Sequence, residues 1–200
     1  ARKRGRPVGD RQAKIGEVIG AAGAVIARDG YAAASLRKVA QAAGAASTGA
    51  VTYYFESKEA MVVAVAEALF DEFDAWLEAH SQACDPQSLC NNLLNWITTQ
   101  GGSETWLVCL QLLVGARGDP VLAAVIARRN ARFLANLARL LERGQAQGLI
   151  RRDVPADVLA DQLAAMGDGW ALMYPLEPAR FGHGRIGHLV DTAAAMLSPS

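Results

Sequence analysis

The chain lacks the features that mark membrane, secreted and disordered proteins. Its 200 residues contain no apolar run near the roughly 18 residues that a membrane-spanning helix needs. The three cysteines, Cys84, Cys90 and Cys109, have no disulfide-framework spacing, and no apolar segment follows the basic N-terminus as in a secretory signal. Because 52% of the residues are apolar, the chain can form a core. We therefore expect a globular cytoplasmic protein.

Signatures of catalysis are also missing. The sequence has no Ser-His-Asp motif, no glycine-rich phosphate loop and no paired-carboxylate signature. One alternative is a zinc site, because His80 and Cys84 lie four residues apart and Cys90 follows. These residues straddle an expected helix end and Pro86, and they have no obvious fourth ligand. We expect no metal, no cofactor and no enzymatic activity.

The net charge of zero conceals two segments of opposite sign. Residues 1–58 hold ten Lys and Arg against four acidic residues, which gives +6, so the other 142 residues carry −6. Such asymmetry is typical of proteins with a nucleic-acid partner. We interpret the neutrality as the sum of a DNA-facing basic part and an acidic body.

Apolar residues recur with helical spacing, and no segment alternates convincingly over the length of a strand. Serines suited to N-capping (Ser35, Ser47, Ser57) and glycines suited to helix ends (Gly30, Gly44) delimit the segments. The pattern predicts an all-α fold of about nine helices. They are expected over residues 10–29, 36–43, 48–55, 58–80, 86–100, 104–116, 120–148, 155–174 and 185–197.

Residues 35–58 (SLRKVAQAAGAASTGAVTYYFESK) carry the most informative pattern. Two short helices with a glycine-containing turn follow a longer helix, which predicts a helix-turn-helix. The second short helix would enter the major groove of DNA, where small and hydrogen-bonding side chains suit base contact. The residues with these properties are Ser47, Thr48, Gly49, Ala50, Thr52 and Tyr53.

Residues 1–9 (ARKRGRPVG) form a basic segment that we interpret as a flexible arm. Arg4 and Arg6, beside glycine and proline, are suited to a narrow A·T-rich minor groove. The alternative is a solvated tail that is attracted to phosphates without reading any sequence.

The motifs of residues 10–66 resemble those of the tetracycline-repressor (TetR) family of bacterial regulators. The resemblance is carried by Gly30-Tyr31, by Ser35 to Ala40, by Gly44 and by Ser47 to Lys58. It implies a helix-turn-helix DNA-binding domain over residues 10–57 and a helical ligand-binding and dimerisation domain over 58–200. It also implies a homodimer that represses transcription from a palindromic operator until a small molecule releases it.

The resemblance assigns roles to individual residues. It places Ser35, Tyr54 and Lys58 at phosphates. It places six residues at bases or the nearby backbone: Arg37, Thr48, Gly49, Ala50, Thr52 and Tyr53.

The chain departs from the family in the turn. Ala45 and Ala46 separate Gly44 from Ser47, where the family has one residue. The extra alanine lengthens the turn or shifts the recognition helix by one residue. A helical small-molecule-binding protein without operator recognition therefore stays open as an alternative.

The second domain contains candidates for an effector pocket. Aromatic walls with few polar groups suit an apolar, aromatic or cationic ligand, and the later helices loosely resemble those of choline-responsive members of the family. Ordinary core packing is the alternative for each residue, and Asp168 is either a counter-charge or an exposed acid. The predicted lining is Trp96, Trp106, Cys109, Phe133, Met166, Trp170 and Tyr174.

The last two long helices are the candidates for dimerisation. In the family they form a four-helix bundle with their counterparts, and here they carry small residues and a wide apolar stripe. Packing of both stripes onto their own domain is the alternative. The predicted interface residues are Leu163, Gly167, Ala171, Ile186, Leu189, Val190, Ala193 and Leu197.

Overall fold

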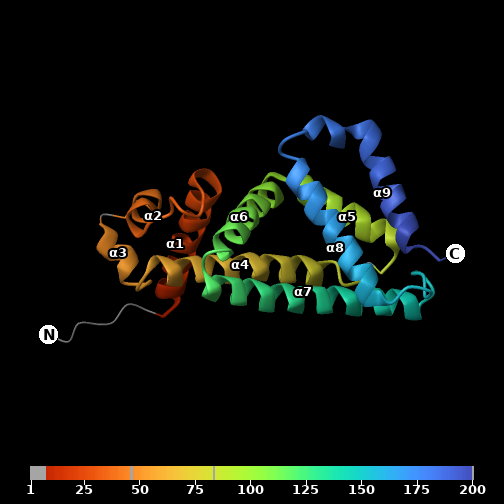
Figure 1. Cartoon of the computed structure of the whole chain (residues 1–200), viewed down its shortest axis with the longest axis horizontal. Coiled ribbons are helices and arrows are strands. Elements are labelled where there is room, and N and C mark those ends of the chain that lie inside the picture. The colour runs from red at the N-terminus through yellow and green to blue at the C-terminus, as the bar shows by residue number, and fades with distance from the viewer. Residues whose placement is uncertain (1–7, 46, 83, 200) are drawn as a thin grey trace. The chain divides into compact units, whose positions relative to one another are not determined.

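The computed structural model describes residues 8–45, 47–82 and 84–199, so most of the predicted basic arm, with Arg4 and Arg6, lies outside the described residues. Within these ranges the all-α prediction is confirmed, since they contain helices and no strand (Figure 1). The helices are α1 (Val8–Asp29), α2 (Leu36–Ala42), α3 (Thr48–Thr52), α4 (Lys58–Ala79), α5 (Pro86–Thr98), α6 (Gln100–Ala116), α7 (Pro120–Ala146), α8 (Ala156–Met173), the 3-10 helix η1 (Pro178–Phe181) and α9 (His183–Leu197).

Glycines end two of these helices by the same backbone geometry. Gly44 has φ +64°, and the amide of Ala45 donates to the Ala40 carbonyl at 2.9 Å while that of Gly44 donates to Gln41 at 3.1 Å. This pair of bonds is a Schellman motif, which needs a left-handed residue after the helix. Gly148, with φ +75°, ends α7 in the same way.

Several helix bounds differ from the sequence prediction: α1 begins at Val8, inside the predicted arm, and α3 ends at Thr52 and not at residue 55. Helix α6 begins at Gln100 and not at residue 104, so it includes Gly101 and Gly102, whose low helix propensity favours a later start. The segment expected to be a break between α8 and α9 contains η1, whose first residue is Pro178. Proline suits this position because the first amide of a helix has no partner within the helix.

The described chain divides into two compact units. The first comprises the described residues up to Leu69 together with Val108–Ile126, and the second comprises Phe70–Leu107 together with the described residues from Ala127 onward. Helices α4, α6 and α7 contribute residues to both units. The functional boundary expected at Lys58 stays a prediction, because packing units and functional domains need not coincide.

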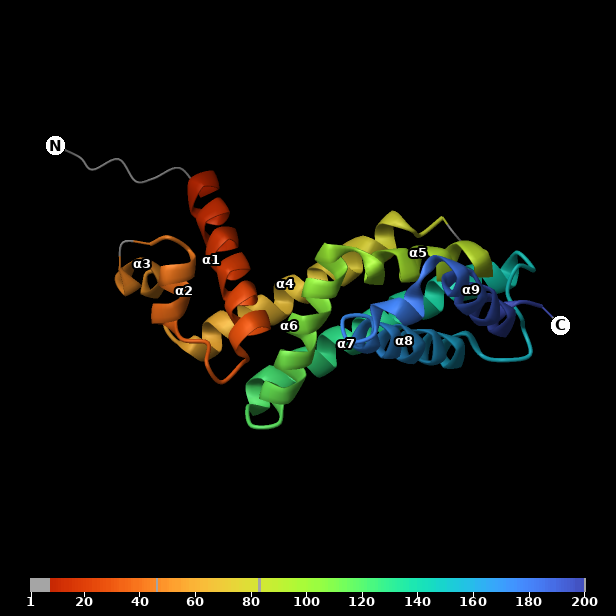
Figure 2. The same cartoon turned by 90° about the horizontal axis from the view of Figure 1, so that it is seen from above.

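The first unit contains the helix-turn-helix. Helix α2 packs against both α1 and α3 (Figure 2). The shared core is apolar, and each helix contributes to it through residues at helical spacing. Its buried members include Val18, Ala22, Val25, Ile26, Val39, Ala40, Val51 and Phe55.

The second unit has its core where α5 packs against α8 and α9 (Figure 1). One charged residue is buried in this unit. Arg129 on α7 donates to Asp71 at 2.7 Å and to Asp74 at 3.2 Å, both on α4, so its charge is paired. No helix of the described chain is long and apolar enough to cross a membrane.

Candidate DNA-binding and effector sites

Helix α3 has one buried and one exposed side. Val51 is 1% exposed, which fixes the helix to the core of the first unit. Gly49, Ala50 and Thr52 are exposed, and Tyr53, which follows the helix, is 72% exposed. The exposed side therefore carries the small and hydrogen-bonding residues that were predicted for base contact, with Thr48 half-buried.

The three predicted N-caps are at helix starts, and two of them make a side-chain capping bond. The Ser57 hydroxyl accepts a hydrogen bond from the Ala60 amide at 3.1 Å. The Ser35 hydroxyl accepts a hydrogen bond from the Lys38 amide at 3.3 Å. Ser47 precedes α3 with extended backbone and makes no side-chain capping bond. Helix α3 thus begins at Thr48, directly after the expected cap.

The basic residues of α2 differ in their surroundings. Lys38 pairs with Asp29 at 3.1 Å, and Asp29 also accepts from Arg28 at 2.7 Å. Hydrogen bonds from Arg28 and then Lys38 hold the pKa of the Asp29 carboxyl well below its usual range. Arg37 is exposed and has no ion pair with any residue that the structure describes. Arg37 is therefore the basic residue of α2 whose guanidinium is available to bind a ligand.

Lys58 is held at the start of α4. Its ammonium donates to the Ala32 carbonyl at 3.1 Å and lies 4.6 Å from the centre of the Tyr31 ring. Since an ammonium has three donors, this arrangement leaves two N–H groups for other acceptors.

Tyr31 joins the end of α1 to the α6–α7 hairpin within the first unit. Its hydroxyl donates to Asp119 at 3.2 Å, and its amide donates to the Gln111 side chain at 3.4 Å. Burial and then Asp119 raise the pKa of the Tyr31 hydroxyl. A Cβ at Gly115 would lie 2.5–2.8 Å from ring carbons of Tyr31, so the ring needs a glycine at that position of α6.

The second unit contains a cluster of aromatic rings around Phe73 of α4. The Phe73 ring centre lies 5.3 Å from that of Trp106, 5.5 Å from that of Trp96 and 5.9 Å from that of Phe133. Trp76 joins through Trp96 at 5.9 Å. We call Phe73, Trp76, Trp96, Trp106 and Phe133 the aromatic cluster.

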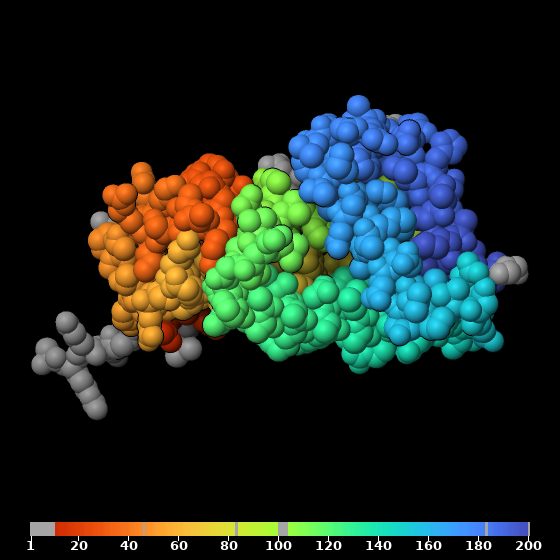
Figure 3. All heavy atoms as spheres, in the orientation of Figure 1, coloured from red at the N-terminus to blue at the C-terminus, as the bar shows by residue number. Residues whose placement is uncertain are grey.

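The cluster includes three of the seven predicted effector residues, Trp96, Trp106 and Phe133. Sequence reasoning missed Phe73 and Trp76, although their spacing of three residues on the long helix places them on one face. The surface of the second unit is hollowed between α7 and α8, with atoms of α4 at the bottom (Figure 3).

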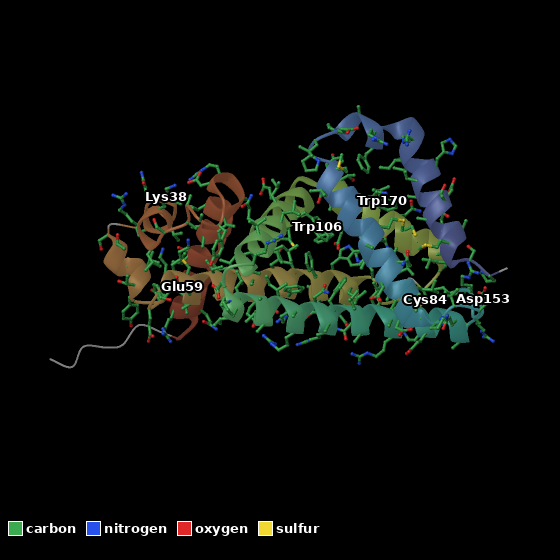
Figure 4. The ribbon with its side chains drawn as sticks, in the orientation of Figure 1. Lys38, Glu59, Cys84, Trp106, Asp153 and Trp170 are labelled. Atoms are coloured by element: carbon green, nitrogen blue, oxygen red, sulfur yellow. The ribbon has the colours of Figure 1, made fainter. Side chains whose placement is uncertain are left out.

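The other predicted effector residues lie elsewhere. Tyr174 donates through its hydroxyl to the Thr98 carbonyl at 3.1 Å, Met166 is half-buried against the core, and Cys109 belongs to the first unit. Figure 4 shows Trp106 on α6 and Trp170 on α8. Trp170 faces a separate pocket between α8, η1 and α9, which is lined by Gly169, Trp170, Met173, Arg180, Phe181, Arg185 and Leu189. Asp168 is exposed and belongs neither to the aromatic cluster nor to the lining of this pocket.

Most of the predicted interface residues have side chains that are buried within their own chain. Six of the eight are buried in the second unit: Leu163, Gly167, Ala171, Val190, Ala193 and Leu197. Ile186 and Leu189 are half-buried against the same core. Side chains that pack inside the chain offer little surface to a partner, which favours the alternative that both stripes pack onto their own domain, and their role in an interface stays a prediction. The exposed apolar residues of this region are Val158, Leu172 and Leu176.

The residues considered for zinc have other surroundings. The His80 ring packs on Trp76 with ring centres 4.9 Å apart, and its Nδ1 lies 2.7 Å from the Trp76 carbonyl. Burial and then the charge of Asp85 raise the pKa of the Cys90 thiol to about 11, so it is protonated at neutral pH. Among the described residues, no three His, Cys, Asp or Glu side chains are grouped closely enough to hold a metal ion.

Comparison with known proteins adds two family matches. Residues 18–65 match the family described as bacterial regulatory proteins, tetR family, and residues 88–199 match the C-terminal domain of BetI-type transcriptional repressors. A comparison with proteins of curated function finds no match.

Solved structures share the fold over nearly the whole chain. A putative TetR-family regulator from Rhodococcus sp. is 20% identical with a TM-score of 0.77, covering 92% of this chain and 98% of that one. A transcriptional regulator from Rhodococcus sp. Rha1 is 26% identical with a TM-score of 0.76, covering 92% and 95%. A putative regulator from Saccharomonospora viridis in complex with choline is 21% identical with a TM-score of 0.72, covering 91% and 95%.

Proposed function

Because the chain belongs to the TetR family of transcriptional regulators, we propose that it binds a palindromic DNA operator as a homodimer, acts as a repressor and is released by a small-molecule effector. The matches to a tetR-family DNA-binding domain and to a repressor C-terminal domain support a regulator and not an enzyme. The dimer, the operator and the release are the steps that need support.

The observation that carries the proposal is the two-sided character of α3. Val51 anchors it, and the opposite side offers Gly49, Ala50, Thr52 and Tyr53 to a groove. Small residues allow the backbone to approach the bases, and Thr48 and Thr52 add hydrogen-bonding hydroxyls.

Phosphate contacts would position this helix. We assign them to Ser35, Tyr54 and Lys58, and we assign base contact to Arg37, which is exposed and unpaired among the described residues. Ser47, at the start of α3, would contact the DNA backbone. Arg4 and Arg6 would reach an adjacent minor groove.

Dimerisation would use α8 and α9. A two-fold operator is matched by a two-fold protein, which spaces two recognition helices by one DNA turn or a multiple of it. The half-buried Ile186 and Leu189, the exposed Val158 and Leu172, and Leu176 shortly after α8 are among the apolar side chains with surface left to cover.

The effector would bind at the aromatic cluster. The neighbour from Saccharomonospora viridis holds choline, which supports a small molecule as ligand, and the aromatic rings suit an apolar, aromatic or cationic one. Phe73 and Trp76 belong to α4, whose first residue is Lys58, so a ligand that displaces α4 changes the position of a phosphate-binding residue.

Release also needs a link to the helix-turn-helix. Tyr31 supports such a link, because it contacts the α6–α7 hairpin through Asp119 and Gln111 and contacts Lys58 through its ring. A shift of the hairpin would therefore act on the end of α1 and the start of α4 together.

Footprinting of the DNA that flanks the protein's own gene tests the proposal. The full chain is expected to protect two half-sites related by a two-fold axis, with centres about 34–36 Å or a multiple apart. Protection of one half-site only would contradict the dimer. The absence of any protected site would favour the alternative, a helical small-molecule-binding protein without operator recognition.

A further inference from the structure

The aromatic cluster contains two hydrogen-bond donors without acceptors. The indole Nε1 atoms of Trp76 and Trp106 are buried, and neither has a hydrogen-bond partner among the residues that the structure describes. A buried donor left unpaired costs about 1–3 kcal/mol, and native proteins keep few of them. Two such donors in one cluster of a ligand-binding domain indicate acceptors that a ligand brings.

Both donors belong to rings that contact the same neighbour. The ring of Trp96 lies 5.9 Å from that of Trp76 and 6.2 Å from that of Trp106. The Phe73 ring centre lies 5.3 Å from that of Trp106 and 5.5 Å from that of Trp96. A ligand that reaches both indoles therefore lies among flat rings, which favours a flat apolar body.

The two unpaired donors disfavour a quaternary ammonium group as the part of the ligand that meets them. Arg129 already lies 5.8 Å from the Phe70 ring, which is packed on Phe73, and its guanidinium engages Asp71 and Asp74. Glu72 accepts from the Thr105 hydroxyl at 2.8 Å. Because the Arg129 charge is balanced by two aspartates, a quaternary ammonium group is disfavoured by its lack of an acceptor: its charged end would leave both indole N–H groups unpaired.

An anionic ligand is disfavoured by the same residues. The Arg129 charge is balanced by two aspartates, so a buried carboxylate would have to be desolvated without an unpaired cation to offset the cost. An uncharged carbonyl group escapes both penalties, because it accepts hydrogen bonds and carries no net charge.

We propose that the effector is an uncharged, flat, carbonyl-bearing molecule that accepts hydrogen bonds from the indole N–H groups of Trp76 and Trp106. The inference rests on the proposed function, since it specifies the ligand of that effector site. It separates this chain from a regulator that recognises a quaternary ammonium.

Two probes of nearly equal shape test the proposal. 2-Acetylnaphthalene carries one carbonyl, and 2-ethylnaphthalene replaces it by a methylene group. Equilibrium dialysis with the full chain is expected to give 2-acetylnaphthalene the lower dissociation constant by about tenfold, the value of one net hydrogen bond that also pairs a buried donor. A third probe, 2-naphthyltrimethylammonium, is expected to bind more weakly than 2-acetylnaphthalene.

Variants identify the donors. The double variant Trp76→Phe with Trp106→Phe removes both N–H groups and keeps aromatic rings, so the ratio between the two naphthalenes should fall toward one. A loss of packing alone would weaken both probes and leave their ratio near tenfold. Trp170→Phe is the matched control, because Trp170 faces the separate pocket between α8, η1 and α9, and it should keep the wild-type ratio.

The outcomes separate this inference from the proposed function. A wild-type ratio near one, tighter binding of the ammonium probe, or no binding of either naphthalene would overturn the carbonyl-bearing ligand while leaving operator binding intact. A missing footprint would overturn the proposed function whatever the probes show. A wild-type ratio near tenfold that the double variant abolishes would support the inference.

Discussion

The recognition helix and the aromatic cluster expose their candidate functional residues to different degrees. Around α3, the residues predicted to touch DNA lie mostly on the outside, and Tyr53 is 72% exposed. In the aromatic cluster, Phe73 is 6% exposed, and its ring centre lies 5.3–5.9 Å from those of Trp106, Trp96 and Phe133. A substitution around α3 should therefore weaken DNA binding with little effect on the free energy of unfolding. A substitution in the aromatic cluster should chiefly lower the free energy of unfolding.

The largest expected difference comes from one aromatic residue in each region. Phe73→Ala removes the ring at the centre of the cluster and should lower the free energy of unfolding by about 3–5 kcal/mol. Tyr53→Ala removes an exposed ring and should change it by less than about 0.5 kcal/mol while weakening DNA binding. Urea unfolding of both variants measures this. Equal losses of stability would remove the distinction between the regions.

A second substitution tests the contact between α6 and Tyr31. In Gly115→Ala the new methyl group would lie 2.5–2.8 Å from the Tyr31 ring, so we expect a loss of about 1–3 kcal/mol. Gly16→Ala on α1 is the control, because its Cβ meets nothing within 4 Å, and it should raise stability by up to about 1 kcal/mol. Thermal unfolding compares the two. A neutral Gly115→Ala would mean that the ring moves aside at no cost.

Two basic residues of the first unit should affect DNA binding in different ways. Arg37→Ala is expected to cost about 1–3 kcal/mol on the operator and little on unrelated DNA, since we assign it to a base. Lys58→Ala should weaken binding to all sequences alike and reduce the salt dependence by about one phosphate contact. Anisotropy titrations on both DNAs measure the four affinities. An interchange of the two patterns would reverse the assignments.

The smallest expected effect distinguishes the two serines. Ser35→Ala removes the acceptor of the Lys38 amide and should lower stability by about 1 kcal/mol. Ser47→Ala removes no capping bond, so its effect on unfolding should be smaller, and its effect on DNA binding should exceed it. Urea unfolding with DNA titration of the same samples provides both values. A larger stability loss in Ser47→Ala would contradict the observed capping.

These differences also explain which parts of the fold the sequence could predict. Helix ends depend on local chemistry, so Gly44 and Ser35 mark real boundaries. Helix α6 begins earlier than predicted and includes a glycine pair that local propensity disfavours, so propensity alone could not place this helix start. The direction in which an apolar stripe faces depends on the rest of the fold. Leu163 and Val190 therefore read as interface candidates in the sequence, although they are buried in their own subunit.

The candidate effector site shows the same limit. Trp96, Trp106 and Phe133 come together, but Trp170 faces another pocket because α8 turns it toward η1. Composition identifies aromatic residues, whereas only the packing of helices distant in sequence decides which rings meet. The recognition helix needed no such information, since its motif lies within one short segment.

The salt dependence of operator binding tests the central claim most directly. Titration of labelled flanking DNA with the full chain at a series of salt concentrations gives the association constant at each. Its logarithm is expected to fall linearly with the logarithm of salt concentration, by about 0.9 for each phosphate contact, because the basic first segment displaces counterions from DNA. Binding that is unaffected by salt, or no binding at any concentration, would contradict the account.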